Sequence, residues 1–172
     1  GRETALKLAG AGAKLVLGAR KREALESLEE EITLMGGEAA FAITDVCVRE
    51  DLQRLVGVAC QRFGQLDVFI SNAGIGPISM LDELRVDDWD AMIDVNLRGV
   101  IYGIAAALPI FRRQSSGYFV SVISTAGLKI VPGQAIYAGT KNAVRTIHEG
   151  LRQEAGPNLR VTGISPGIIR TS

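Results

Sequence analysis

A tyrosine, a lysine and a serine are spaced along this chain in a way that could move a proton to and from an alcohol. Tyr137 and Lys141 are four residues apart, about one helical turn, so both side chains project from one helix face. An ammonium beside a phenol favours the phenolate and lets the tyrosine exchange a proton nearer neutral pH. Ser124, thirteen residues before Tyr137, could hold a substrate oxygen. The pair alone would also fit an exposed lysine beside a half-buried tyrosine, so its surroundings decide.

Short apolar runs alternate with longer helical patterns, which predicts strands and helices in turn. The expected strands are 14–18, 38–43, 66–70, 118–123 and 160–165, the third of them buried, and the expected helices are 2–11, 21–35, 50–63, 88–113 and 134–154. Such alternation is typical of an α/β fold with a doubly wound parallel sheet, in three α/β/α layers. No repeat, linker or low-complexity segment divides the chain, so residues 1–172 are expected to form one domain.

Polar and glycine-rich segments follow four of the predicted strands. They are Asp45, the Ser-Asn-Ala-Gly-Ile-Gly segment 71–76, Ser124, and the Ser-Pro-Gly segment 165–167. Ligands of open parallel sheets bind beyond the carboxyl ends of the strands. These four segments therefore predict one binding site at that rim of the sheet.

Composition and charge exclude several classes of protein. The chain has 19 basic and 19 acidic residues and no basic block, so no nucleic acid or anionic membrane partner is expected. Its apolar stretches look too short or too interrupted to span a bilayer, and no signal peptide is recognisable. Cys47 and Cys60 lack metal-ligand spacing and are expected to be reduced thiols of a cytoplasmic protein without a metal site.

The single histidine and the carboxylates at 87, 88 and 90 could point to a hydrolase or to an acidic site. His148, the one histidine, is eleven residues after Tyr137, roughly 16 Å along a helix, so it is expected on a helix face or interface outside the site. The carboxylates at 87, 88 and 90 begin a predicted helix, where its dipole favours them, so capping is expected.

In combination these residues resemble the short-chain dehydrogenase/reductase family in its single-domain form, over essentially the whole chain. The matching motifs are Asn72-Ala73-Gly74 with Ser71 in place of the family's first Asn, Asn96, Ser124-Thr125-Ala126-Gly127, the Tyr137 and Lys141 pair, and Pro166-Gly167 with Thr171. Their joint occurrence in order and with the family's gaps makes the resemblance specific. It implies a nicotinamide-dependent oxidoreductase that interconverts a small-molecule alcohol and a carbonyl.

The resemblance also implies a role for each catalytic residue. Tyr137 would be the general acid for carbonyl reduction and the general base for alcohol oxidation. Lys141 would favour the deprotonated tyrosine and bind the nicotinamide ribose, while Ser124 would bind and polarise the substrate oxygen. Asn96 would support a water-linked proton path through Lys141. The alternative is a non-catalytic Rossmann-like binding or regulatory domain, which would not need all four residues.

Cofactor contacts follow from the same resemblance. Asp45 would accept a hydrogen bond from the adenine amino group with Val46 packed nearby, although Asp45 could instead cap the helix that follows. The remaining contacts of the cofactor would come from Asn72, Ala73, Gly74, Tyr137, Lys141, Pro166, Gly167, Ile169 and Thr171. Ala19 occupies the position where an NAD enzyme carries a carboxylate, and Arg20 and Lys21 follow directly, so NADP(H) is favoured over NAD(H).

The chain departs from the family pattern at its ends. Residues 2–11 already read as the first helix, without the strand and glycine-rich turn expected before it, and the last strand is also missing. The expected first strand lies mid-sheet, so its two neighbours would lose their shared partner. We therefore expect an internal fragment of a complete reductase, neither stably folded nor active by itself; a truncated protein without catalysis is the alternative.

Assembly and substrate shape are predicted only in outline. The helices around 96–111 and 137–154 suggest a homodimer or homotetramer, through Ala105–Ala107 and Val144–Leu151, unless those residues pack within the monomer. Ile130, Val131 and Pro132, together with residues 75–78, predict a partly apolar substrate pocket.

Overall fold

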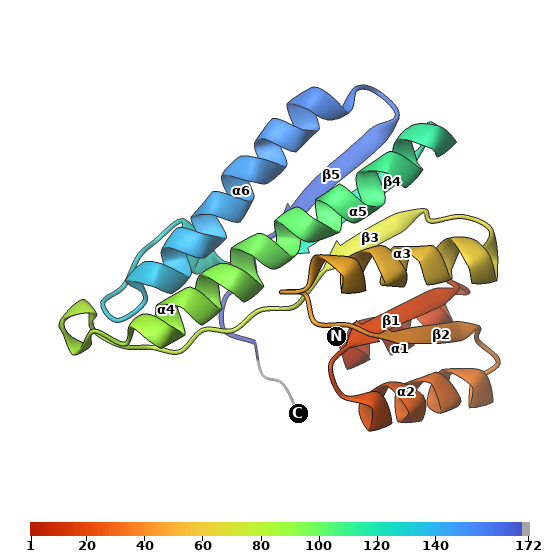
Figure 1. Cartoon of the computed structure of the whole chain (residues 1–172), viewed down its shortest axis with the longest axis horizontal. Helices are drawn as coiled ribbons and strands as arrows, with labels where there is room; N and C mark the ends of the chain where they lie inside the picture. The colour runs from red at the N-terminus through yellow and green to blue at the C-terminus, as the bar shows by residue number, and fades with distance from the viewer. Residues whose placement is uncertain (170–172) are drawn as a thin grey trace.

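The computed structural model describes residues 1–169 and confirms the alternating α/β order (Figure 1). The strands are β1 Leu15–Ala19, β2 Ala39–Ile43, β3 Val68–Ser71, β4 Gly117–Val122 and β5 Leu159–Ile164. The helices are α1 Arg2–Gly10, α2 Arg22–Leu34, α3 Arg49–Phe63, α4 Val86–Met92, α5 Gly99–Gln114 and α6 Ala135–Ala155, with short 3-10 turns η1 Leu81–Glu83 and η3 Thr125–Gly127 and a π-helical segment η2 Ile93–Arg98. All predicted elements are therefore present, with shifted ends.

The strands are parallel and form two sheets. β1 pairs with β2, and β3, β4 and β5 form a second sheet in that order. Within residues 1–169, β1 and β3 do not pair, as expected for two strands that lack a shared neighbour. All the strands end toward the same side, which brings the segments that follow them together.

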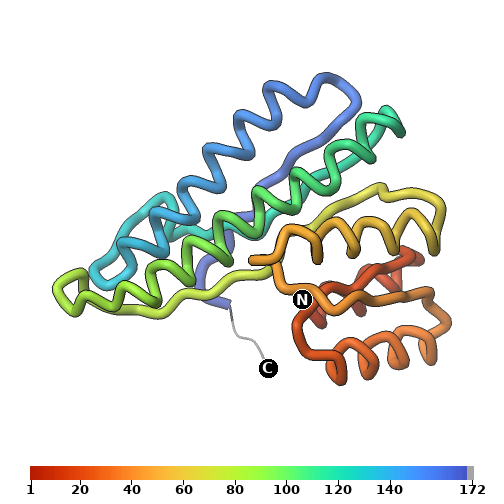
Figure 2. The backbone as a smooth tube through the Cα atoms, viewed as in Figure 1, coloured from red at the N-terminus to blue at the C-terminus, as the bar shows by residue number. Residues whose placement is uncertain are grey.

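Helix α3 packs against β1 and β2 and against α5, and the backbone trace in Figure 2 shows it between them. Leu52 and Val56 enter a core cluster that also holds Phe69 of β3 and Phe119 of β4. On the other side of the helix, the Leu55 side chain lies where a Cβ on Gly18 of β1 would come within 2.8 Å of it. A close helix–strand approach of this kind requires glycine at position 18.

Helices cover β1 and β2 on both faces, but they cover the larger sheet mainly on one. α1 and α2 share a second core cluster with β1, opposite α3. On β3, Phe69 is buried, whereas Val68 and Ile70 are 42% and 37% exposed. Side chains alternate between faces of a strand, and no described helix covers the second face. The expectation of a buried strand at 66–70 was therefore wrong.

The expected helix 88–113 is part of a longer helical stretch, Val86–Gln114. An 18-residue window of this 29-residue stretch has a mean hydropathy of 1.4, so by length and composition alone the stretch could cross a membrane, a test that a core helix can also pass. The π-helical segment carries the helix through polar residues without a break. Gly103, Ala107 and Phe111 are buried against the sheet, so the stretch packs as a core helix.

Two further expectations concern helix ends and faces. Asp87 and Asp88 lie in the first turn of α4, where the dipole favours them, but no side chain caps that helix. Ala107, Val144 and Leu151, which were among the residues considered for assembly, are buried in the core of the monomer.

Candidate active site

Tyr137 and Lys141 lie on one face of α6, as their spacing predicts. Lys141 is only 5% exposed, which rules out the exposed-lysine alternative. Its Nζ donates a hydrogen bond to the carbonyl of Val122, at 2.9 Å, and lies 5.8 Å from the centre of the Tyr137 ring. Burial lowers the pKa of Lys141 below its ordinary value, because desolvation disfavours the charged form. An ammonium is thus held beside the phenol at the sheet rim.

The loop after β3 lies directly against this pair, and two glycines allow it. A Cβ on Gly74 would come within 3.3 Å of Lys141 Nζ and 3.4 Å of Asn96 Oδ1. A Cβ on Gly76 would come within 3.1 Å of the Tyr137 ring. The loop backbone therefore borders both candidate catalytic residues, and larger side chains there would crowd them.

Asn96 holds that loop in place from the π-helical segment, where it is fully buried. Its Oδ1 accepts the N–H of Ile75 and its Nδ2 donates to the Ile75 carbonyl, both at 2.8 Å. Nδ2 also lies 3.2 Å from Thr140 Oγ1, which donates to the Tyr137 carbonyl. Sequence reasoning missed Ile75 and Thr140, since one acts through its backbone and the other lies between two motif residues.

Ser124 follows β4 at the same rim and is half-buried. Its Oγ accepts a hydrogen bond from the N–H of Ala126, at 3.1 Å, and caps the short turn η3. The hydroxyl keeps its own proton, so it can still donate to a substrate oxygen. Val122, which anchors Lys141, is two residues earlier on the same strand.

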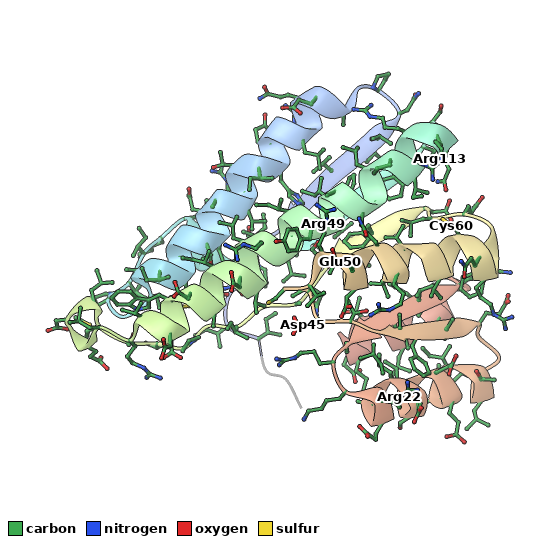
Figure 3. All side chains as sticks on the ribbon, viewed as in Figure 1. Arg22, Asp45, Arg49, Glu50, Cys60 and Arg113 are labelled. Carbon is green, nitrogen blue, oxygen red and sulfur yellow. The ribbon has the colours of Figure 1, made fainter. Side chains whose placement is uncertain are left out.

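The adenine-side candidates occupy the loop between β2 and α3, where Figure 3 labels Asp45. Asp45 Oδ1 accepts the N–H of Cys47 at 2.9 Å, and the cap of α3 is Val48. The capping alternative for Asp45 was therefore wrong. Val46 packs on α5, with its Cγ2 2.9 Å from where a Cβ of Gly99 would be.

The other expected cofactor contacts also lie beyond strand ends. Asn72, Ala73 and Gly74 are exposed just after β3, and Gly1 approaches the Asn72 side chain. Thr125 of the Ser124 turn donates its N–H to the Pro166 carbonyl, at 3.0 Å, which ties the segment after β5 to the site. Gly167 and Ile169 are exposed in that segment, and Thr171 lies outside the described residues.

The basic residues after β1 differ in their engagement. Arg20 and Lys21 are exposed and make no ion pair or hydrogen bond within residues 1–169. Arg22 instead binds Glu26 at 3.2 Å and stacks over Phe41. Arg20 and Lys21 are thus the cations at this strand end that a phosphate could use.

A cavity of about 560 Å³ lies between the loop after β3 and the loop before α6. Ile130, Val131 and Pro132 line it as expected, with Met80 and Leu81 opposite. Residues 79–82 line this cavity, and the part of residues 75–78 in substrate specificity stays a prediction. The Ser79 N–H binds the Gly133 carbonyl, at 3.1 Å, and joins the two loops.

His148 lies on the buried face of α6, and its Nε2 is 2.7 Å from Ser121 Oγ of β4. Among residues 1–169, no group of three His, Cys, Asp or Glu side chains could hold a metal ion. The described site is therefore one of a phenol, an ammonium, hydroxyls and an amide.

The chain is similar to known proteins in sequence and in fold. The family profile described as short chain dehydrogenase matches residues 1–172. An uncharacterized oxidoreductase of Listeria monocytogenes is 49% identical over 99% of this chain and 70% of its own length.

Two solved structures illustrate the similarity in fold. An alcohol dehydrogenase of Thermococcus sibiricus complexed with 5-hydroxy-NADP has a TM-score of 0.91 and 31% identity, over 99% of this chain and 73% of its own. A short chain dehydrogenase/reductase of Burkholderia phymatum in complex with NAD has a TM-score of 0.92 and 30% identity, over 98% of this chain and 62% of its own. The chain spans about 70% of the length of the sequence relative it matches. By sequence, fold and motif geometry, this chain belongs to the short-chain dehydrogenase/reductase family of oxidoreductases.

Proposed function

We propose that this protein interconverts an alcohol and a carbonyl with NADP(H), using Tyr137 as general acid and base. The observation that carries the proposal is the buried Lys141, held by Val122 on the face of α6 that carries Tyr137. A solvated lysine at this spacing would be free to point away from the phenol. Burial and the hydrogen bond to Val122 instead hold the Lys141 ammonium in one place beside the Tyr137 ring.

Each polar group has a task that its geometry supports. An ammonium has three N–H donors, and Val122 uses one, so Lys141 keeps two for the tyrosine oxygen and a cofactor hydroxyl. In reduction the Tyr137 hydroxyl gives its proton to the carbonyl oxygen, which Ser124 Oγ–H also polarises; in oxidation Tyr137 takes the proton back. The bound nicotinamide supplies or accepts the hydride. Asn96 holds the Gly74 loop against these groups.

The residues at the rim fit a dinucleotide. Glycine at position 74 leaves space beside Lys141, and Asp45 Oδ2 has no hydrogen-bond partner within residues 1–169. Arg20 and Lys21 leave their charges free for a phosphate, and Ala19 offers no carboxylate for ribose hydroxyls. These features support NADP(H) over NAD(H), since a guanidinium binds a 2′-phosphate through paired hydrogen bonds.

The first test measures NADPH oxidation by the full-length gene product against a panel of ketones and aldehydes. Tyr137→Phe removes the transferred proton and is expected to reduce turnover by more than about a hundredfold. Tyr118→Phe is the matched control, because the Tyr118 hydroxyl binds Thr162 away from the site. Turnover retained in Tyr137→Phe would refute the proposed chemistry. A folded, NADPH-binding protein without turnover would favour the non-catalytic binding domain.

The cofactor preference is tested by comparing kcat/KM with NADPH and with NADH. Arg20→Ala is expected to raise KM for NADPH by about tenfold or more, because the variant loses a charge-assisted hydrogen bond to the phosphate. Arg22→Ala is the matched control, since Arg22 is already engaged by Glu26. Equal or better efficiency of the wild type with NADH would contradict the preference.

A further inference from the structure

Two polar contacts connect α6 to β4, and the proposed chemistry uses only one of them. Lys141 Nζ binds the Val122 carbonyl, at 2.9 Å. His148, two helical turns further along the same face, binds the neighbouring residue Ser121 at 2.7 Å. Both partners of this second contact are buried, Ser121 at 2% and His148 at 5% exposed. Eleven residues of helix separate His148 from Tyr137, roughly 16 Å, and three residues of extended chain separate Ser121 from Ser124, roughly 10 Å, so the contact lies well behind both groups.

The remaining packing between these elements is apolar. Val144 contacts Ile123, and Leu151 and Ala155 join the main core cluster. Apolar contacts are non-directional, whereas a hydrogen bond between two buried groups is lost if the partners slide by about an ångström. The helix carries Tyr137 and the strand leads to Ser124, so their relative position sets the spacing of the two groups.

The unpartnered nitrogen of His148 identifies the proton arrangement. Nδ1 is buried and has no hydrogen-bond partner among the described residues. A buried N–H without an acceptor is rarer than a bare acceptor, so the proton belongs on Nε2, which donates to Ser121 Oγ. Protonation at Nδ1 would add an unpaired buried donor. Consistently, burial lowers the pKa of His148 below its ordinary value.

We propose that His148, acting through Ser121, is a positioning residue that fixes where α6 sits along β4 and thereby sets the distance between Tyr137 and Ser124. This inference rests on the proposed roles of those two residues. His148 itself touches neither substrate nor cofactor. It acts in its neutral form, with the proton on Nε2.

The charged groups around His148 come from its own helix. A cavity of about 580 Å³ beside it is lined by Arg145, Glu149 and Arg152 of α6, and by uncharged residues that include Ile123, Val161 and Gly163. Glu149 is bound to Arg152 through two hydrogen bonds of 2.8 Å. Strand β4, which carries Ser121, has no charged residue.

The test compares His148→Leu, His148→Gln and Ser121→Ala in the full-length gene product, with Tyr137→Phe in the same assay. His148→Leu is expected to lower kcat by about tenfold or more with little change in KM, since a misplacement of about 1 Å can cost a hundredfold. Gln offers an N–H at similar reach and is expected to restore most of kcat. Leu151→Ala is the matched structural control: it should lower the Tm and leave kcat unchanged.

Further readouts separate positioning from stability. The double variant Ser121→Ala/His148→Leu should be no slower than the slower single variant, because both remove one contact. Nitrogen NMR of the His148 ring should show the tautomer with the proton on Nε2. In Ser121→Ala it should show a mixture of the two neutral tautomers. The wild-type kcat should fall in acid as His148 takes up a proton, and His148→Gln should lack that decline.

The inference is overturned if folded His148→Leu keeps the wild-type kcat, or if it behaves like Leu151→Ala. If His148→Leu does not fold, Ser121→Ala decides: an unchanged kcat overturns the inference and a lowered kcat supports it. Turnover retained by Tyr137→Phe would instead show that the proposed function is wrong.

Discussion

Asn96 makes more hydrogen bonds than any other side chain of the described site. Its amide binds both backbone groups of Ile75 and approaches the hydroxyl of Thr140. The loop it holds carries Gly74 and Gly76 against Lys141 and Tyr137. Breaking these hydrogen bonds would leave buried polar groups without partners, which costs more free energy of folding than breaking an exposed hydrogen bond.

Asn96→Ala is therefore expected to lower the free energy of unfolding by about 2–3 kcal/mol, because it removes a fully buried amide and leaves the part-buried Ile75 N–H and carbonyl without these partners. It should also raise KM for the cofactor, as the Gly74 loop loses its anchor. Denaturant unfolding and steady-state kinetics measure the two effects. Asn142→Ala is the matched control, since that side chain makes one hydrogen bond, to the Gly127 carbonyl. A cost no larger than that of the control would contradict the assigned role.

Local spacing explains why most single residues of the site could be predicted. The offsets among Ser124, Tyr137 and Lys141 are short, and the structure places them at one rim. The Ile75 contact could not be predicted, because it depends on how a loop distant in sequence folds over Asn96. His148 was expected on a helix face, and with Tyr137, Lys141 and Val144 it follows the i, i+4, i+7 pattern of the buried one. Its partner Ser121 had no such pattern.

At the scale of elements, glycines set how closely helices approach strands. A Cβ on Gly103 of α5 would come within 2.5 Å of the Phe69 ring on β3. Phe69 itself packs edge-on against Phe119, at a ring separation of 6.5 Å, so it has little room to move. By contrast, Gly57 of α3 has nothing within 4 Å of its Cβ position. Glycine is therefore expected to stabilise the fold at position 103 and to destabilise it at position 57, relative to alanine.

Gly103→Ala is expected to destabilise the fold by about 1–3 kcal/mol, since the added methyl forces Phe69 or α5 to move. Gly57→Ala is expected to stabilise it by about 0.5–1 kcal/mol, because alanine restricts the unfolded chain and suits a helix interior. Chemical denaturation of both variants in the full-length gene product measures the difference. Two equal effects of the same sign would show that close approach of α5 to β3 is not what Gly103 provides.

The element types were predictable and some of their details were not. Apolar periodicity located every helix and strand, because burial against a sheet imposes it. The π-helical segment was not predicted, because a change in the backbone hydrogen-bond pattern leaves no mark in the residue types. Such segments are often found at functional sites, and this one carries Asn96. The exposure of Val68 and Ile70 was also missed, because an apolar run does not say which faces have a covering layer.

At the scale of the whole molecule, the two sheets are connected through side chains and not through a strand ladder. β1 and β3 each leave one edge without a backbone partner in the part of the chain that the structure describes. Helix α3 packs on β1 and β2, with Leu55 against β1, while on its other side Leu52 and Val56 join the core cluster that α5 shares with the larger sheet. Unpaired strand edges are sites of fraying and association, and exposed Val68 and Ile70 add apolar surface beside one of them.

The 172-residue chain expressed alone is accordingly expected to unfold without a cooperative transition and to gain no thermal stability from NADPH. Its two sheets can open separately, since no strand ladder links them within residues 1–169 and they are coupled mainly by apolar packing around α3. Circular dichroism melts with and without NADPH, beside the full-length gene product, measure this. Hydrogen exchange should be fast at β1 and β3 and slowest at β4, which is paired on both sides. A single sharp transition that NADPH moves upward would show instead that α3 couples the sheets strongly enough to complete the cofactor site.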